Sequence, residues 1–218
     1  MDALIVIGMF GVVGVSMVVG WLFSTERRLK GELRAARVWP IGELPENTLG
    51  RVVGQAQPLD GVIHSPLTGR ACVCYVVEVM DTSSGSKTLI RESGGVPFLL
   101  VDPSGRAIID PRIAGVALTI DANTTSGTFD DATREEQAFL AKHGHTSKGW
   151  LFNKDLEYTE GVIEVGETVA VLGSGVREPD PQAMPAEAYR GQPVTRLRLT
   201  GSRRHPLRIS DDPSTTQR

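Results

Sequence analysis

The N-terminal part of the chain is continuously apolar, whereas the rest alternates between short apolar runs and polar turns. No charged residue lies between Ala3 and Thr25. A helix over residues 4–23 would rise about 30 Å, which matches the hydrocarbon core of a bilayer. The run is apolar on every face, which disfavours a buried core helix, and a signal peptide would have a shorter apolar region after a basic start. We therefore predict that residues 1–25 form a single uncleaved transmembrane anchor.

The charges beside this segment predict its orientation. Basic residues gather in residues 26–37, whereas the other flank offers only Asp2 and the amino terminus. By the positive-inside rule, the N-terminus lies outside the inner cell membrane and the soluble part lies in the cytoplasm. Ser16 and Gly20 form a small-xxx-small pair that offers a face for self-association of the anchor. Anionic lipid headgroups stabilise nearby basic side chains by about 1 kcal/mol each, and the expected contacts are Arg27, Arg28, Lys30 and Arg34.

The chain after the anchor divides into a helix, a linker, a domain and a tail. Residues 26–48 are expected to form a basic juxtamembrane helix followed by a linker that Pro and Gly residues interrupt. The strand-rich domain is expected over residues 49–212. From Asp211 onward the chain is polar and is expected to fray, with residues 213–218 as the tail.

Strand patterns recur throughout the domain. Residues 71–79 are apolar on both faces, which is typical of a central strand. Asp102 at the first position and Gly105 at the fourth are the signature of a type I turn. Many Gly and Pro residues favour short strands joined by turns. Further strands are expected at residues 51–57, 87–91, 96–101, 107–110, 150–159, 161–165, 168–172 and 194–199.

One helix is indicated near residues 130–142. Asp130 or Asp131 is a suitable N-cap, Thr133 with Glu136 fits a capping box, and a glycine follows the apolar residues. The fold class is therefore α+β, mostly antiparallel β with one or two helices, behind the single anchor. A partly closed barrel is one architecture that fits this pattern.

Composition narrows the functional classes. A formal net charge of −3 gives no electrostatic reason for nucleic-acid binding. Cys72 and Cys74 would face the same side of one strand, which disfavours a disulfide, and two thiols do not complete a structural zinc site. We expect them to pack in the core. There is no P-loop and no dinucleotide fingerprint, so no cofactor is expected.

Four segments, in order, resemble one known family. HSPLTGRACVCYVVEV at residues 64–79 resembles its S-P-x-T-G-x-x-C segment and the strand after it, and FLLVDPSGRAIIDP at 98–111 resembles its strand-turn-strand. EGVIEVGETVAVLGSG at 160–175 resembles E-x-x-L-x-x-G-E-x-V-x-V-L-G, and RISD at 208–211 resembles its closing I-S-D. The family is the GIDE, or BAM ("beside a membrane"), domain, and the likeness spans roughly residues 50–212. The resemblance implies a strand-rich domain beside a membrane helix.

That family includes a mitochondrial outer-membrane RING ubiquitin ligase and many shorter bacterial proteins. A RING finger needs eight Cys or His ligands for two zinc ions, whereas this sequence has two Cys and four His. We therefore expect a bacterial, membrane-anchored homologue without the RING zinc sites. It should hold well under one zinc per chain, and no metal ligands are assigned.

Two groups of residues have side chains capable of chemistry, but their sequence context does not favour a catalytic or metal site. Ser84 and Lys87 match S-x-x-K, a serine nucleophile with a lysine base, but they sit in a turn rather than at a helix start. His143 and His145 offer two imidazoles at a helix end, but no third metal ligand is identifiable. No catalytic residue is assigned.

The turn over residues 64–70 is the best candidate binding site. It offers hydroxyls and a guanidinium at one edge of the domain, and Arg suits bidentate carboxylate or phosphate recognition; the alternative is a turn that only leads into the central strand. Its candidate residues are Ser65, Pro66, Thr68, Gly69 and Arg70.

Two functions remain open. The first is a membrane-tethered, non-catalytic binding or scaffolding module with an unknown protein partner. The alternative is an enzyme, either a ubiquitin-ligase-like transferase or a Ser/Lys hydrolase.

Overall fold

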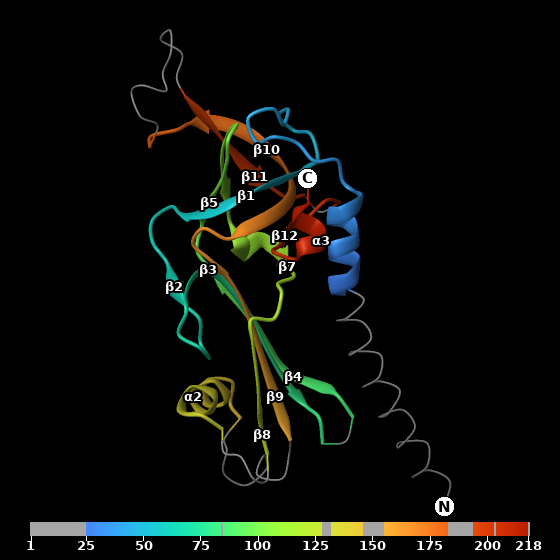
Figure 1. Ribbon diagram of the computed structural model, residues 1–218, viewed down its shortest axis with the longest axis vertical. Coiled ribbons are helices and arrows are strands. Elements are labelled where there is room, and N and C mark those ends of the chain that lie inside the picture. Colours follow the sequence, from blue (N-terminus) through green and yellow to red (C-terminus); the bar gives the residue numbers. More distant parts are fainter. Residues whose placement is uncertain are drawn as a thin grey trace, which may run out of the picture.

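The computed structural model describes residues 25–83, 85–127, 132–145, 155–182, 194–202 and 204–217. The molecule is elongated and has two strand-rich lobes (Figure 1). The barrel lobe consists of a curled seven-stranded sheet. The blade lobe consists of a five-stranded sheet and one helix at its far end. Mostly antiparallel pairing, few helices and a curled sheet confirm the antiparallel, partly closed β architecture of the expected fold class. The anchor that this fold class also included is not among the described helices.

The barrel lobe curls because β1 (Gly50–Pro58) pairs antiparallel with two other strands, β5 and β10. Hydrogen-bonded neighbours then form a ring, β1-β5-β6-β11-β10, and β12 and β7 extend the sheet beyond β10. Two of the pairings, β11 with β6 and β12 with β7, are parallel. The other strands are β5 (Phe98–Asp102), β6 (Gly105–Ile109), β7 (Ala114–Val116), β10 (Thr168–Pro179), β11 (Thr195–Thr200) and β12 (Leu207–Ser210).

Apolar side chains fill the interior of this ring. Phe98, Leu100, Val171 and Leu197 are fully buried there with their neighbours. The predicted turn between β5 and β6 is confirmed as a tight hairpin, in which Asp102 accepts hydrogen bonds from the Ser104 and Gly105 amides. A short 3-10 helix, η1 (Pro111–Ile113), follows β6.

The blade lobe is organised around β3 (Ala71–Asp81), as the expected central strand. β9 lies along one edge of β3, and β4 and β2 pair with it along the other. A bulge between Cys72 and Cys74 breaks the strict alternation expected there, so Cys72, Val73 and Cys74 are all buried. The other strands are β2 (Ile63–His64), β4 (Lys87–Gly95), β8 (Ala122–Ser126) and β9 (Leu156–Glu164).

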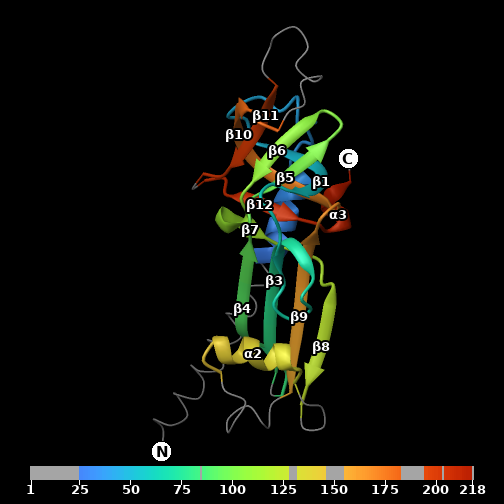
Figure 2. The same ribbon diagram turned by 90° about the vertical axis from the view of Figure 1, so that its left-hand side faces the viewer.

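Helix α2 (Arg134–Lys142) crosses one face of the blade (Figure 2). Thr133 and Glu136 form the predicted capping box, so Thr133 is the N-cap in place of either aspartate. Phe139 and Leu140 are buried with apolar side chains of β3 and β9. The helix therefore closes a second, smaller core.

The segments on either side of the domain pack onto the barrel lobe. Residues 25–35 form the expected helix, and Leu33 is fully buried with side chains of β1 and β10. The expected linker is also packed, because Ile41 and Leu44 are fully buried in the barrel core.

The expectation of a frayed tail is wrong for helix α3 (Pro213–Thr216). Asp212 caps this helix by accepting a hydrogen bond from the Ser214 amide, and Thr215 is fully buried. Arg51 donates a hydrogen bond from Nη1 to the Thr215 carbonyl at 2.8 Å. Local capping and one buried guanidinium thus order residues whose sequence is polar.

Within the described part of the chain, no helix is both long and apolar enough to cross a membrane. The predicted anchor, including Ser16 and Gly20, lies outside the described residues apart from Thr25.

Candidate functional site

The 64–70 turn is built around one buried carboxylate, that of Glu160 on β9. The Ser65 hydroxyl and the Leu67 amide donate to it at 3.0 and 2.9 Å. Thr68 donates from both its amide, at 3.2 Å, and its hydroxyl. Glu160 is 1% exposed and Ser65 is 3% exposed. Four donors therefore satisfy a carboxylate that would otherwise be costly to bury.

The turn also closes on itself. Ser65 and Arg70 exchange backbone and side-chain hydrogen bonds, because the Ser65 amide donates to the Arg70 carbonyl and the Arg70 amide donates to Ser65 Oγ. Gly69 has φ of 67°, a left-handed conformation that glycine adopts without steric cost. Pro66 lines a hollow of about 340 Å³ beside α2, together with Phe139.

Arg70 pairs with two carboxylates, and its side chain is 35% exposed. Its Nε donates to Glu164 Oε1 at 3.0 Å, and its Nη1 lies 3.6 Å from Asp121 Oδ1. The hydrogen bond to Glu164 raises the pKa of Arg70, and Asp121 adds to this effect. An external carboxylate or phosphate would have to compete with both partners for this guanidinium.

The structure thus brings the predicted residues together and adds the acceptors that sequence reasoning missed. Ser65, Thr68 and Glu160 are positions of two separate motifs quoted above, S-P-x-T-G and E-x-x-L-x-x-G-E, and they hydrogen-bond to one another. Both motifs are recognisable in the sequence. The contact itself needs the fold, because β9 must bring Glu160 to the turn.

Both cysteines are free and buried. Burial raises the pKa of Cys72 to about 11 and that of Cys74 to about 12. The thiolate is the nucleophile and metal ligand, so neither side chain is poised for such chemistry at neutral pH. This agrees with the packing role expected for them.

A second polar cluster ties α2 to the blade. Glu92 on β4 accepts hydrogen bonds from Tyr75 Oη at 2.6 Å, Lys142 Nζ at 2.8 Å and His143 Nε2 at 2.8 Å. Burial opposes ionisation of Glu92, but these hydrogen bonds lower its pKa overall. The ring of His143 also packs on Phe139, with centroids 4.8 Å apart.

The other candidate residues from the sequence, the Ser/Lys pair and the two histidines, form no catalytic or metal site among the described residues. Lys87 begins β4, and Ser84 lies outside the described residues. His143 bonds to Glu92, and among the described residues no group of three or more Cys, His, Asp or Glu side chains is arranged to hold a metal ion.

These features define a two-lobed β-protein. Its motif residues Ser65, Thr68 and Glu160 form a hydrogen-bonded clasp that fixes the 64–70 turn to β9. Residues 77–187 match the family model of GIDE, which carries the description E3 ubiquitin ligase. The match covers just over half of the 218 residues, so the chain belongs to the GIDE family, as its motifs predicted. Comparison with curated proteins and with solved structures gives no significant match.

Proposed function

We propose that the chain is a membrane-tethered, non-catalytic binding or scaffolding module of the GIDE family. The observation that carries this proposal is the internal use of the motif residues. Ser65 and Thr68 donate to Glu160, so the polar groups of the two motifs hold the turn in place. Of these three residues, Glu160 lies within the matched residues 77–187. A reactive set would instead need a nucleophile and base exposed to a substrate.

The family description supplies the main alternative, a ubiquitin-ligase-like transferase. The matched residues 77–187 contain two histidines, His143 and His145, and no cysteine. A RING needs eight zinc ligands to recruit a conjugating enzyme. The matched part of this chain therefore lacks the ligand set for RING-type activity.

The membrane tether is part of the proposal. Residues 1–25 are long and apolar enough to span a bilayer, and the basic residues that follow favour a cytoplasmic domain. In this arrangement, the inner membrane concentrates the module and presents both lobes to cytoplasmic partners.

Reconstitution tests the non-catalytic assignment. The full chain in detergent is mixed with ubiquitin, an activating enzyme, a panel of conjugating enzymes and ATP, and a known RING ligase serves as the positive control. We expect no conjugates above the level without the chain. Conjugates that depend on the chain and survive Lys87→Ala would replace the proposal with the transferase alternative.

Membrane attachment needs a separate test. The full chain should stay in the membrane pellet after carbonate extraction, whereas a variant lacking residues 1–25 should not. A C-terminal reporter that fluoresces only in the cytoplasm should be bright. High activity of a C-terminal alkaline phosphatase fusion, which works only in the periplasm, would reverse the proposed orientation.

A further inference from the structure

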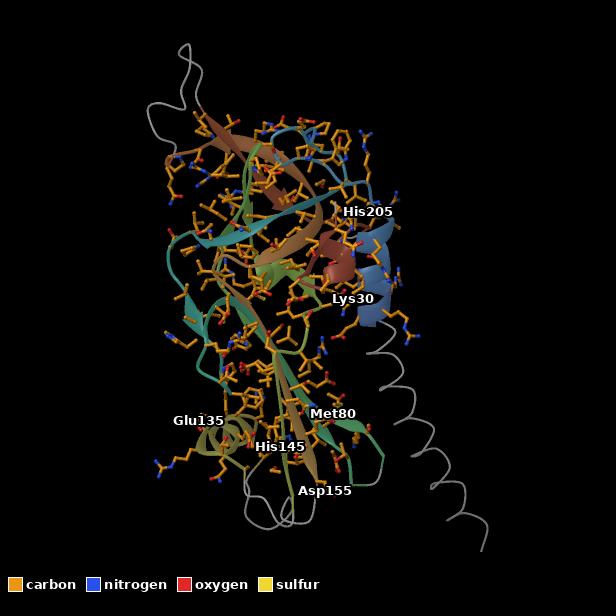
Figure 3. The ribbon with its side chains drawn as sticks, viewed as in Figure 1. Lys30, Met80, Glu135, His145, Asp155 and His205 are labelled. Carbon is orange, nitrogen blue, oxygen red and sulfur yellow. The ribbon has the colours of Figure 1, made fainter. Side chains whose placement is uncertain are left out.

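A groove runs between residues 25–36, of which 25–35 are helical, and the loop that joins β11 to β12. Its volume is about 690 Å³, within the size range of small-molecule sites. One side is formed by helix residues spaced three or four apart, which lie on one face of the helix. Figure 3 shows His205 beside the end of this helix that leads into the barrel lobe. The lining residues are Thr25, Arg28, Glu32, Ala35, Ala36, Leu49, Leu172, Arg204, His205, Pro206 and Arg208.

The groove is positively charged although the whole chain has a net charge of −3. Three arginines line it against one carboxylate, that of Glu32. Within the described residues, the side chain of Arg204 makes no hydrogen bond or ion pair, so no neighbouring carboxylate neutralises its charge.

Glu32 organises the other two arginines. Its two oxygens accept from Arg28 Nε and Arg208 Nε, each at 3.0 Å. Burial opposes ionisation of Glu32, but the hydrogen bonds from Arg208 and Arg28 lower its pKa. Among the described residues, each guanidinium donates to Glu32 from Nε alone, and Nη1 of Arg208 also lies against Gly115 of β7. The side chain of Arg208 is only 18% exposed, so the surrounding protein and Glu32 hold its guanidinium in place.

The rest of the lining is apolar. Leu49, which is 39% exposed, contributes a large hydrophobic surface, and Leu172 and Pro206 extend it. A ligand that fits both parts has an anionic group for the arginines and an apolar portion for these side chains. Arginine forks match the oxygens of phosphate better than a single point charge would.

We propose that this groove binds the phosphate group of an amphiphilic phosphate ester, with Arg28, Arg204 and Arg208 as its ligands. The site is distinct from a general attraction of the basic helix to a charged surface. Arg27 and Arg34 are exposed on the same helix and do not line the groove. Lys30 is committed elsewhere, because its Nζ lies 2.7 Å from Asp212 Oδ2, next to α3 (Figure 3).

Calorimetric titration of the full chain in neutral detergent tests this assignment. The probe is dihexanoyl phosphatidic acid, a soluble phosphate ester with short acyl chains, and zwitterionic dihexanoyl phosphatidylcholine is the matched control ligand. We expect saturable binding of one phosphatidic acid per chain, and at least tenfold weaker binding of the phosphatidylcholine. Equal binding of the two probes would contradict a phosphate site.

Matched variants separate the groove from general surface charge. Arg28→Gln and Arg204→Gln alter exposed lining residues and should each weaken phosphatidic acid binding at least tenfold. Arg27→Gln and Arg34→Gln remove the same charge outside the groove and should change binding less than twofold. Equal losses in all four variants, or no saturable binding by the parent chain, would overturn the proposal.

Titration with inorganic phosphate distinguishes the two sources of this chemistry. Binding at least tenfold weaker than that of phosphatidic acid assigns the groove to a lipid-like headgroup, because the apolar lining then contributes. Binding of comparable strength, with the same dependence on Arg204, assigns the groove to free phosphate and removes the amphiphile from the proposal.

Discussion

In the barrel lobe, the sheet curls until β1 pairs with both β5 and β10, and apolar side chains face a closed interior. In the blade lobe, the sheet stays open, and α2 covers only part of one face. Three carboxylates, two buried and one partly buried, connect the covering segments to the sheet. Glu160 holds the 64–70 turn, Glu92 holds the end of α2, and Glu136 accepts from Thr124 on β8.

The difference shows how an open sheet compensates for a small apolar core. Hydrophobic burial contributes roughly 25 cal/mol per Å², and a single short helix removes little surface from water. Polar ties can fix such a helix or turn in one place because an unpaired buried carboxylate is costly. We therefore expect apolar truncations to dominate in the barrel lobe and losses of polar partners to dominate in the blade lobe.

Phe98→Ala should have the largest effect, because Phe98 is fully buried in the barrel core. Truncating such a ring costs about 3–5 kcal/mol. Denaturant unfolding of the full chain in detergent measures this change. Ile113→Ala is the control, because Ile113 is 58% exposed and its truncation should cost under about 0.5 kcal/mol. Similar losses in both variants would remove the evidence for a dominant barrel core.

Glu160→Ala tests the polar side of the comparison. It leaves four donors of the 64–70 turn without their acceptor, which should cost about 3 kcal/mol. Hydrogen exchange should rise first in this turn. Glu157→Ala is a control on the same strand, because Glu157 is less buried and accepts only from Asn123 among the described residues. A Glu160→Ala protein as stable as the parent would refute the clasp.

Local signals in the sequence were sufficient for much of this fold. The apolar run of β3 predicted a central strand, and Thr133 with Glu136 predicted the start of α2, because these patterns act within a few residues. The short strands β2, β7, β8 and β12 were missed. β8, with the sequence ANTTS, has a single apolar residue and is held by pairing with β9.

Contacts between distant segments explain the other differences. β9 is one strand, although Gly161 favoured a break; glycine is needed there because a Cβ would clash with the Thr119 carbonyl of a crossing loop. The residues of the candidate site were predictable, but their partner Glu160 was not, because the contact joins segments about 95 residues apart.

Asp212→Asn tests whether ionic ties also matter at the edge of the barrel lobe. The hydrogen bond from Lys30 lowers the pKa of Asp212 from 3.8 to about 2. A carboxyl group whose pKa is lowered by folding stabilises the folded state at a pH above its ordinary pKa. This stabilisation is lost as the pH falls through the pKa of the folded state. The variant should lose about 1–2 kcal/mol at pH 7.

The pH dependence checks the cause. The difference in the free energy of unfolding between Asp212→Asn and the parent should shrink as the pH falls from about 4 to about 2. Denaturant unfolding at each pH measures this difference. Asp60→Asn is the control, because Asp60 is exposed in a loop. A difference that stays constant over this range would mean that the charge of Asp212 is not the source of its effect.

Thr133→Ala should have the smallest effect and the most local one. It removes the N-cap hydroxyl that accepts from the Glu136 amide at 3.2 Å, which should cost about 1 kcal/mol. Because the buried side chains of α2 pack against strands of the blade lobe, α2 should unfold locally while the barrel lobe stays folded. Amides of α2 should exchange about fivefold faster, as a loss of 1 kcal/mol implies, while those of β1 and β10 stay unchanged. Thr125→Ala, at an exposed position of β8, is the matched control and should leave α2 exchange unaltered. Faster exchange throughout the barrel lobe would show that the two lobes unfold as one unit, and the comparison between them would then fail.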